Sequence, residues 1–552
     1  MPKIKASLIP ATLISIVLLA PAAAQVLPPV YAPRPEPPPP DPLTNSQSAV
    51  TDDWLTFSHD AQRTGWNNGD TAFNPGNVSG LKLLWSTQLP FNVSPYSGQE
   101  LTPPVVIAGV KTARGVKTLA FTISADSTLF AIDADTGKVF WQKAFPNPVP
   151  PVHPPDWQCT NAEQATPVID KAKGILYFTS LDGKLHGVSL ADGAEKLTPT
   201  QMVAPYARNW SLNLVDNQVY TSGGRACGGD TANPMVSGNI DVADVSDPAH
   251  VTVQRIYTGH GRPGGPWDRG GPVLGPQGVY VATADGRYDP ASGYLGESVV
   301  AVRLGGSGIA DSFTPSNWKY LNSYDLDLGA GSPVVFPFHG RTLIAMGSKE
   351  GIEYLLDASG LGGPDHMTPL TQTPRLGNDP VMLEQYGIWG APATWESAAG
   401  DRYIYIPMWN KPSKDGPAYP HSNGDLSQGS IMAFKVTQQG RAYSLEPAWV
   451  SGVAQIPDSP ITAGGVVFAI ATGEQTIQNH KPSFPNALAA ANFRNTPVGH
   501  EILYAFDAQT GEQLYSSGDL LKGWTHFTEP VVSHGKVFVV SYDGHVYAFG
   551  LK

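Results

Sequence analysis

The sequence contains little cysteine and little charge. Of its 552 residues only two are cysteines and 15% are charged, with a formal net charge of −12. No run of lysine or arginine is longer than a pair, so the basic stripe typical of nucleic-acid binding is missing and nucleic acid is not expected as a partner. The chain also has no C-x-x-C-H motif and no zinc-ligand spacing, so we expect no c-type haem and no structural zinc.

Long apolar runs are scarce as well. The clearest lies in residues 1–24, where Lys3 and Lys5 precede an apolar run and small residues end it at Ala24, the pattern of a cleaved secretory signal. An uncleaved membrane anchor is the alternative, but the run is short for a bilayer span. Residues 25–52 are rich in proline and are predicted to form a disordered tether. We therefore expect a periplasmic or secreted protein without a membrane span after cleavage.

Glycine and proline, in contrast, are abundant, with 58 and 52 copies, and they punctuate a repeated strand pattern. Residues 119–145 read LAFTISADSTLFAIDADTGKVFWQKAF, which predicts three strands and a tight turn at Gly137. The same pattern recurs at residues 175–197, 502–517 and 537–551. One small sheet cannot bury both of its faces alone, so the copies are expected to pack against one another.

Weaker copies, most of them preceded by a short proline-containing strand, bring the number of predicted units to eight. The last unit lacks an outer strand, and residues 81–89 form a strand with no sheet of their own. If residues 81–89 pair with residues 546–551, the ring closes and no edge strand is left exposed. The units begin near residues 102, 165, 208, 269, 329, 388, 457 and 526.

The repeats therefore predict an all-β protein, an eight-bladed β-propeller of four-stranded antiparallel sheets over residues 53–552. A β-solenoid or two stacked sandwiches are the alternatives, but the repeat period is longer than a solenoid rung. Residues 54–67, with His59, Arg63 and Trp66, are predicted to cap the closure of the ring as a structural element.

The two cysteines, Cys159 and Cys227, lie beside predicted inner strands of the second and third units. An even number of cysteines in an exported protein favours a disulfide, and we predict that these two pair across adjacent blades. Two independent free thiols are the alternative.

The stretches LFAIDADTGKVFWQ and LYAFDAQTGEQLYSS resemble the repeat of pyrroloquinoline quinone (PQQ) propellers, in which an AxDxxTGxxxW stretch docks successive blades. The resemblance covers nearly all of the mature chain. Quinoprotein alcohol dehydrogenases share this repeat with non-enzymatic propellers such as the outer-membrane assembly lipoprotein BamB. The repeat therefore points to the fold more strongly than to a function.

Three stretches are similar to active-site segments of the quinoprotein dehydrogenases. GSKEGIEYLLDA places Lys349 where a lysine of the family reaches the cofactor. YDLDLG places Asp327, with Asp325 second, where the family carries its catalytic aspartate. The Ala284-Asp285 pair stands where the family has a calcium ligand, and a carboxylate suits a hard cation. Considered without the resemblance, Lys349 and Asp327 are also ordinary turn residues.

Residues beside the proline of each unit are expected to line a funnel at the ring's centre. By the resemblance, Arg208, Arg269 and Lys349 would bind the three carboxylates of PQQ, with Trp389 and Glu529 near them. Three features depart from the family pattern. The adjacent cysteine pair is absent, no calcium-binding Glu is recognisable in the third unit, and Trp267 lies a few residues before the position of the stacking Trp.

The resemblance implies an exported quinoprotein dehydrogenase that oxidises an alcohol or a sugar hydroxyl. It implies PQQ and Ca²⁺ as cofactors, Asp327 as general base, and a separate electron acceptor such as a cytochrome. Two alternatives stay open: a non-catalytic propeller that binds a partner in the cell envelope, and a hydrolase or lyase that uses the funnel carboxylates.

Overall fold

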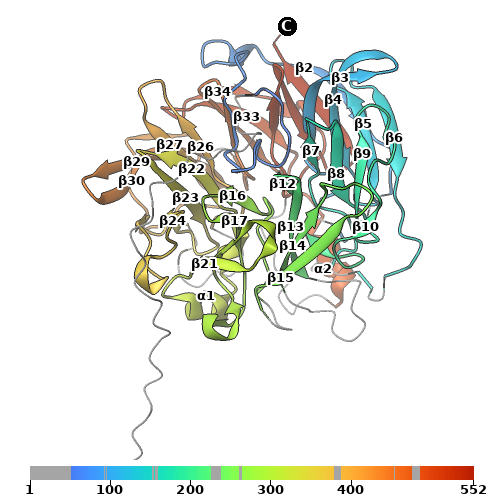
Figure 1. The fold of residues 1–552 in the computed structure, drawn as a ribbon. Helices are drawn as coiled ribbons and strands as arrows, with labels where there is room; N and C mark the ends of the chain where they lie inside the picture. Colours follow the sequence, from blue (N-terminus) through green and yellow to red (C-terminus); the bar gives the residue numbers. More distant parts are fainter. Residues whose placement is uncertain are drawn as a thin grey trace, which may run out of the picture. The chain divides into compact units, whose positions relative to one another are not determined.

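The computed structural model describes residues 51–92, 94, 96, 97, 99–151, 154, 155, 159–225, 238–259, 264–377, 379, 387–452, 454–474 and 485–551. In this part of the chain, small antiparallel sheets follow one another as the blades of an eight-bladed β-propeller (Figure 1). Blades 1 and 2 are β3 (Val105–Thr112), β4 (Gly115–Ile123), β5 (Thr128–Asp133) and β6 (Val139–Ala144), then β7 (Val168–Asp170), β8 (Ile175–Thr179), β9 (Lys184–Ser189) and β10 (Thr200–Gln201).

Blades 3 to 5 follow the same order. Blade 3 also includes the short β11 (Arg208–Asn209), which pairs with β13. Blade 3 consists of β12 (Asn213–Val215), β13 (Gln218–Arg225), β14 (Asn239–Asp244) and β15 (Thr252–Tyr257). Blade 4 consists of β16 (Val273–Gly275), β17 (Gly278–Ala282), β20 (Val299–Val302) and β21 (Ile309–Phe313). Blade 5 consists of β22 (Val334–Phe338), β23 (Arg341–Gly347), β24 (Glu353–Asp357) and β25 (Thr371–Gln372).

Blades 6 to 8 complete the ring. Blade 6 carries the extra strand β28 (His421–Asn423) and blade 7 carries β1 (Trp66–Asn67). Blade 6 consists of β26 (Ala393–Glu396), β27 (Arg402–Trp409), β29 (Gly429–Gln439) and β30 (Ala442–Ser451). Blade 7 consists of β31 (Ile461–Ala463), β32 (Val466–Ala471), β33 (Ile502–Asp507) and β34 (Gln513–Ser516). Blade 8 consists of β35 (Val531–Ser533), β36 (Lys536–Val540), β37 (His545–Gly550) and β2 (Lys82–Gln88).

The predicted blades and the predicted closure are both confirmed. Each inner strand begins a few residues after the predicted start of its unit. The fourth strand of blade 8 is β2, which pairs antiparallel with β37 from Lys82 opposite Gly550 to Gln88 opposite His545. The first part of the chain thus supplies the outer strand of the last blade.

A tryptophan on an outer strand docks on the turn of the next blade. The Nε1 of Trp85 donates to the carbonyl of Ala134, 3.1 Å away, and its ring lies against Gly137. Gly137 has φ +72° and a Cβ there would lie 2.6 Å from the ring, so both its backbone and its neighbour require glycine. Equivalent contacts join Trp141 to Leu190 and Gly193, and Trp449 to Ala508 and Gly511.

Residues 54–67, here called the N-terminal strap, contact every blade at its inner strand. Trp54 pairs with Val106 of blade 1, and Asn67 Nδ2 donates to the carbonyl of Val532 in blade 8 at 2.8 Å. The strap thus links all eight blades, which confirms the predicted cap. The intervening bonds run from Ile169, Leu274, Val335, Thr394 and Thr462 amides to the carbonyls of Leu55, Ala61, Gln62, Thr64 and Gly65, and from Thr56 to Leu212.

Arg63 lies at the centre of the strap with its side chain fully buried. Its guanidinium donates to Thr56 Oγ1 at 2.6 Å, to the carbonyl of Phe57 at 3.0 Å and to the carbonyl of Leu212 at 2.9 Å. Burial lowers its pKa to about 10, although Glu529 and Asp60 favour the charged form, so the arginine is charged at neutral pH.

In the part of the chain that the structure describes, two α-helices and a small hairpin are inserted between strands. They are α1 (Trp318–Tyr324), α2 (Ala487–Arg494), and β18 (Tyr288–Asp289) with β19 (Tyr294–Leu295). Both helices are drawn at the lower end of the view in Figure 1. No helix of the described residues is long and apolar enough to cross a membrane. The 3₁₀ turns are η1 (Val78–Gly80), η2 (Pro290–Ser292), η3 (Leu304–Gly306), η4 (Leu328–Ala330), η5 (Gly363–Asp365) and η6 (Gly518–Leu520).

The predicted disulfide stays a prediction, because Cys227 lies outside the described residues. We expect intact-mass analysis of the denatured protein to show no alkylation before reduction and two added alkyl groups after it, because a disulfide protects both thiols. Alkylation of both cysteines without a reducing agent would identify them as free thiols.

Candidate functional site

The hairpin of blade 4 brings two carboxylates to the same end of its sheet. Asp285 follows β17 and Glu297 precedes β20, and these strands are antiparallel partners. The ladder continues past the strand ends, where the Glu297 amide donates to the carbonyl of Ala284 at 3.0 Å. Glu297, which the sequence analysis did not single out, therefore lies beside Asp285 because of strand pairing.

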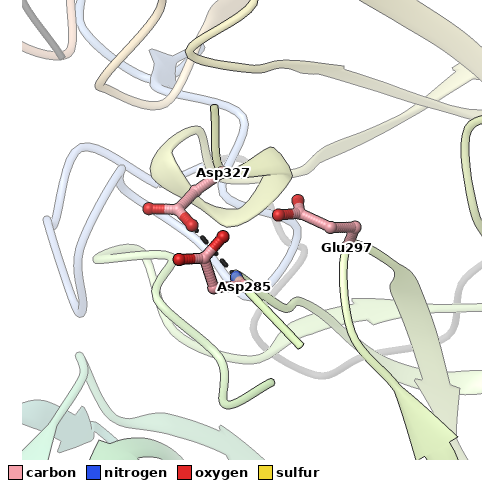
Figure 2. A group of neighbouring side chains, drawn as sticks. All are labelled: Asp285, Glu297 and Asp327. Carbon is pink, nitrogen blue, oxygen red and sulfur yellow. Dashed lines mark hydrogen bonds between the residues drawn. The ribbon is translucent and has the colours of Figure 1, made fainter. Parts of the chain in front are cut away.

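Asp327 reaches the same place from the connection between blades 4 and 5. After α1 the chain reverses at Asp325, which has φ +53°, and then enters η4. Asp327 Oδ1 accepts a hydrogen bond from the Asp285 amide at 3.0 Å, and Glu297 Oε2 accepts one from the Leu328 amide at 2.7 Å. These bonds hold Asp285, Glu297 and Asp327, here called the acidic trio (Figure 2), with one oxygen of each within 4.8 Å of the others.

Ionising all three carboxylates of the acidic trio without a bound cation would cost free energy. Burial, followed by repulsion from Asp327, raises the pKa of Asp285 to about 8. Burial also raises the pKa of Glu297 well above its ordinary value, with Asp327 again adding repulsion. Among the described residues, Asp285 Oδ1 and Glu297 Oε1 are buried and have no hydrogen-bond partner. Three converging carboxylates, two of which have an unused oxygen, fit a hard cation such as Ca²⁺.

Lys349 forms the cationic edge of the site. It is buried, and its Nζ lies 2.5 Å from Asp327 Oδ2 and 3.1 Å from Asp325 Oδ1. Burial opposes the charge of Lys349, but the two aspartates outweigh it and raise the pKa of the ammonium. Lys349 also holds the pKa of Asp327 below its usual value despite burial. Asp327 is therefore the ionised member of the trio at neutral pH.

A cluster of three aromatic rings begins at Lys349. Its Nζ is 4.7 Å from the ring centroid of Trp389, which stacks on Trp409 at a centroid distance of 4.7 Å and an interplanar angle of 9°. Phe527 lies nearly parallel to both, 6.5 Å from Trp389. Lys349, Asp325, Asp327, Asp285 and Trp389, which the sequence analysis named from separate segments, therefore lie next to one another, and their role as a binding site stays a prediction.

Arg269 contacts this aromatic cluster at Phe527, and Arg208 lies close to Arg269. The Arg269 guanidinium stacks over Phe527 and lies 5.3 Å from the ring centroid of Trp210. Arg208 contacts Trp210 and is 4.7 Å from the ring centroid of Trp267. The two arginines are close enough for each to disfavour the other's charge. Arg208, Arg269 and Trp267 thus form a cationic and aromatic group next to Phe527.

Glu529 is placed differently from the other predicted site residues. Its Oε1 accepts a hydrogen bond from the Ser58 amide at 2.6 Å and its Oε2 accepts one from the Ser58 hydroxyl at 2.8 Å. Both carboxylate oxygens are therefore bound to the N-terminal strap. We leave Glu529 out of the binding set proposed below.

No family model matches the chain, and no curated protein matches it in sequence. Solved structures do match its fold. The quinohemoprotein alcohol dehydrogenase from Comamonas testosteroni is 16% identical, with a TM-score of 0.56, over 92% of this chain and 81% of that chain. The quinohemoprotein alcohol dehydrogenase ADHIIG from Pseudomonas putida HK5 is 15% identical, with a TM-score of 0.58, over 93% and 83%.

A europium-containing methanol dehydrogenase matches over 92% of this chain and 99% of that chain, with 14% identity and a TM-score of 0.56. The fold of this chain is therefore similar to that of the quinoprotein alcohol dehydrogenases. At these identities the likeness concerns the fold, and the chemistry has to be argued from the site.

Proposed function

We propose that the protein is a quinone-dependent dehydrogenase that oxidises an alcohol or a sugar hydroxyl and passes the electrons to a separate carrier. The observation that carries the proposal is the acidic trio directly beside Lys349 and Asp325. A structural ring has no need for three crowded carboxylates, two of which keep an oxygen without a hydrogen-bond partner among the described residues, because such groups are costly to bury. The propeller fold shared with quinoprotein dehydrogenases supports the same conclusion.

The residues of the site fit both cofactors. Asp285, Glu297 and Asp327 would hold Ca²⁺ or a trivalent ion. Lys349, Arg208 and Arg269 would bind the carboxylates of PQQ, and Trp389 and Trp267 would lie near its ring system. When bound, the quinone accepts the electrons of the oxidised hydroxyl and the cation acts as a Lewis acid.

Asp325 and Asp327 differ in what each can do. Asp327 belongs to the trio and is ionised because of Lys349, which suits a metal ligand. Asp325 lies outside the trio, and its side chain is 37% exposed. Burial raises the pKa of Asp325 to about 6 despite Lys349, in the range of an effective general base. We therefore assign the proton of the substrate hydroxyl to Asp325, in place of the Asp327 that the sequence pattern favoured.

The compartment is part of the proposal. Residues 1–24 carry the pattern of a secretory signal, and a quinoprotein dehydrogenase of this kind would work in the periplasm or outside the cell. The electron acceptor would be a separate protein such as a cytochrome, because this chain has no C-x-x-C-H motif.

Metal binding gives the first test. We expect Ca²⁺ at about 100 times its Kd to stabilise the purified protein by about 2.7 kcal/mol. Glu297→Gln should abolish this shift without lowering the stability of the metal-free protein, because it removes a repelling carboxylate. La³⁺ is tested in parallel, since a structural neighbour contains europium. Asp415→Asn, at an exposed position, is the control.

Reconstitution tests the activity itself. The metal-loaded protein is mixed with PQQ and assayed for dye reduction with a panel of alcohols and sugars. No stabilisation by either ion and no dye reduction with any substrate would reject the dehydrogenase and favour a non-catalytic propeller.

A further inference from the structure

A histidine of blade 8 lies between two carboxylates of the residues that precede the N-terminal strap. His534 and Gly535 form the two-residue turn between β35 and β36. His534 Nε2 lies 2.7 Å from Asp53 Oδ1, and its Nδ1 lies 3.3 Å from Asp52 Oδ2. The backbone amide of His534 also donates to Asp52 Oδ1 at 2.9 Å. Each ring nitrogen of His534 therefore faces a carboxylate oxygen.

Asp53 connects this histidine to two further blades. Asp53 is buried, and its Oδ1 also accepts a hydrogen bond from the Ala108 amide of blade 1 at 2.9 Å. Its Oδ2 lies 2.6 Å from Nζ of Lys171, which follows β7 of blade 2. The seam of the ring, where blade 8 meets blade 1, is therefore bridged by the contact between His534 and Asp53.

Only the doubly protonated ring of His534 can donate to both carboxylates. A neutral imidazole has a proton on one nitrogen, so its other nitrogen would present a lone pair to a carboxylate oxygen. Burial opposes the charge of His534, but the hydrogen bond with Asp53 and the charge of Asp52 outweigh it and raise its pKa above 6.5. Burial likewise opposes the charge of Asp53, but hydrogen bonds from His534 and Lys171 lower its pKa to about 2.

The other charged groups near the turn change this balance little. Lys536 disfavours the charge of His534, but its Nζ is paired with Asp135 Oδ1 at 2.8 Å. Asp70 is close to Asp52, because burial and then repulsion from Asp52 raise the pKa of Asp70. Among the described residues, two carboxylates therefore favour the charged form of His534, and one lysine opposes it.

Blade 5 contains the same turn in different surroundings. His339 and Gly340 join β22 to β23 with φ of 46° and 78°, close to the 50° and 68° of the turn in blade 8. His339 is exposed, and its Nδ1 lies 3.3 Å from the side-chain oxygen of Gln438, a neutral group. Among the described residues, His339 thus has the backbone conformation of His534 and no carboxylate beside it.

We propose that His534 is a pH-sensitive clasp, which in its protonated form holds the residues before the N-terminal strap across the seam between blade 8 and blade 1. Because the pKa of His534 is higher in the folded protein than in the unfolded chain, its contribution to stability is complete below pH 6.5. It is lost as the pH rises through the folded value. The contribution of Asp53 is complete above pH 3.8 and is lost as the pH falls towards about 2. The clasp does not require the dehydrogenase activity proposed above.

Denaturant unfolding of the full-length protein at about pH 6 and about pH 9 tests the clasp. His534→Asn keeps the turn, because asparagine readily adopts positive φ, but its side chain does not titrate. At the lower pH it should reduce the ratio of folded to unfolded protein about tenfold, since it removes a hydrogen bond between charged groups. At the higher pH most of this difference from the wild type should disappear. His339→Asn, the matched control, should have the same effect at both pH values.

NMR of protein labelled at the histidine Cε1 follows the protonation directly. The signal that is missing in His534→Asn should titrate in the wild type with a midpoint above 6.5. Asp52→Asn should lower this midpoint, because it removes one of the two carboxylates. A midpoint at or below 6.5, or an equal loss of stability in His534→Asn at both pH values, would overturn the clasp.

Hydrogen exchange shows whether the clasp acts at the seam. At about pH 6 the Ala108 amide, which is bonded to Asp53, should exchange about tenfold faster in His534→Asn than in the wild type. The same amide should exchange at the wild-type rate in His339→Asn. If the Ala108 amide exchanges equally fast in both variants, His534 does not hold the seam and the proposal is rejected.

Discussion

A chain that begins at residue 68 is expected not to fold, whereas a chain that begins at residue 51 should fold like the full-length protein. The shorter chain lacks the N-terminal strap, which bonds to the inner strand of each of the eight blades. A backbone hydrogen bond contributes about 1 kcal/mol net, and burial of Trp54 about 3 to 5 kcal/mol more. The loss is comparable to the whole stability of a typical domain, about 5–15 kcal/mol.

Circular dichroism, together with the denaturant midpoint, measures this effect. Arg63→Met is the point variant that tests the centre of the strap, because it leaves the carbonyl of Leu212 without its guanidinium donor. We expect it to destabilise the protein by about 3 kcal/mol or more, since it breaks a buried charged network. A chain beginning at residue 68 that melts cooperatively at the full-length temperature would show that the blades need no strap.

The second large effect is expected at Asp325. Asp325→Asn should lower kcat of the reconstituted enzyme by about 10²–10⁴-fold, the usual contribution of a general base. The protein should still bind metal, because the acidic trio is intact. Asp327→Asn should instead abolish metal binding, and activity should be lost with it. Asp415→Asn is again the exposed control.

The pH dependence gives Asp325 a signature of its own. Its pKa is raised to about 6, and only the ionised carboxylate can accept a proton, so kcat/KM should rise with pH through about 6 and then level off. Asp325→Asn should remove this rise. If Asp325→Asn keeps full activity and the same pH profile, the general base is another group, and Asp327 becomes the candidate again.

Much of the ring could be predicted from local pattern. The D-x-x-T-G turns and the tryptophans that dock on them repeat, so the blades can be counted from sequence. A missing outer strand in the last unit and a spare strand at residues 81–89 were enough to predict the pairing of β2 with β37. Residues close together in the sequence determine these turns and strands, so the amino-acid sequence alone is enough to predict them.

The site was less visible because its members come from separate segments. Lys349, Asp325 and Asp285 were proposed from motif resemblance, whereas Glu297 was not considered because the calcium-binding Glu was sought in the third unit. Extending the antiparallel pairing of β17 and β20 by two residues would have placed Glu297 beside Asp285. The contact between His534 and Asp53 carries no sequence pattern, because the two residues are 481 positions apart in the chain.

The closure of the ring also has a consequence for how the chain reaches its native state. Ser58 bonds to Glu529, 471 residues away, and β2 finds its partner only in β37 at the other end of the chain. Contacts between residues this far apart in the sequence form slowly, because the entropy of closing a long loop is lost before the contact contributes any favourable free energy. During synthesis, β2 therefore stays unpaired until β37 has been made, and the ring of blades cannot close before then.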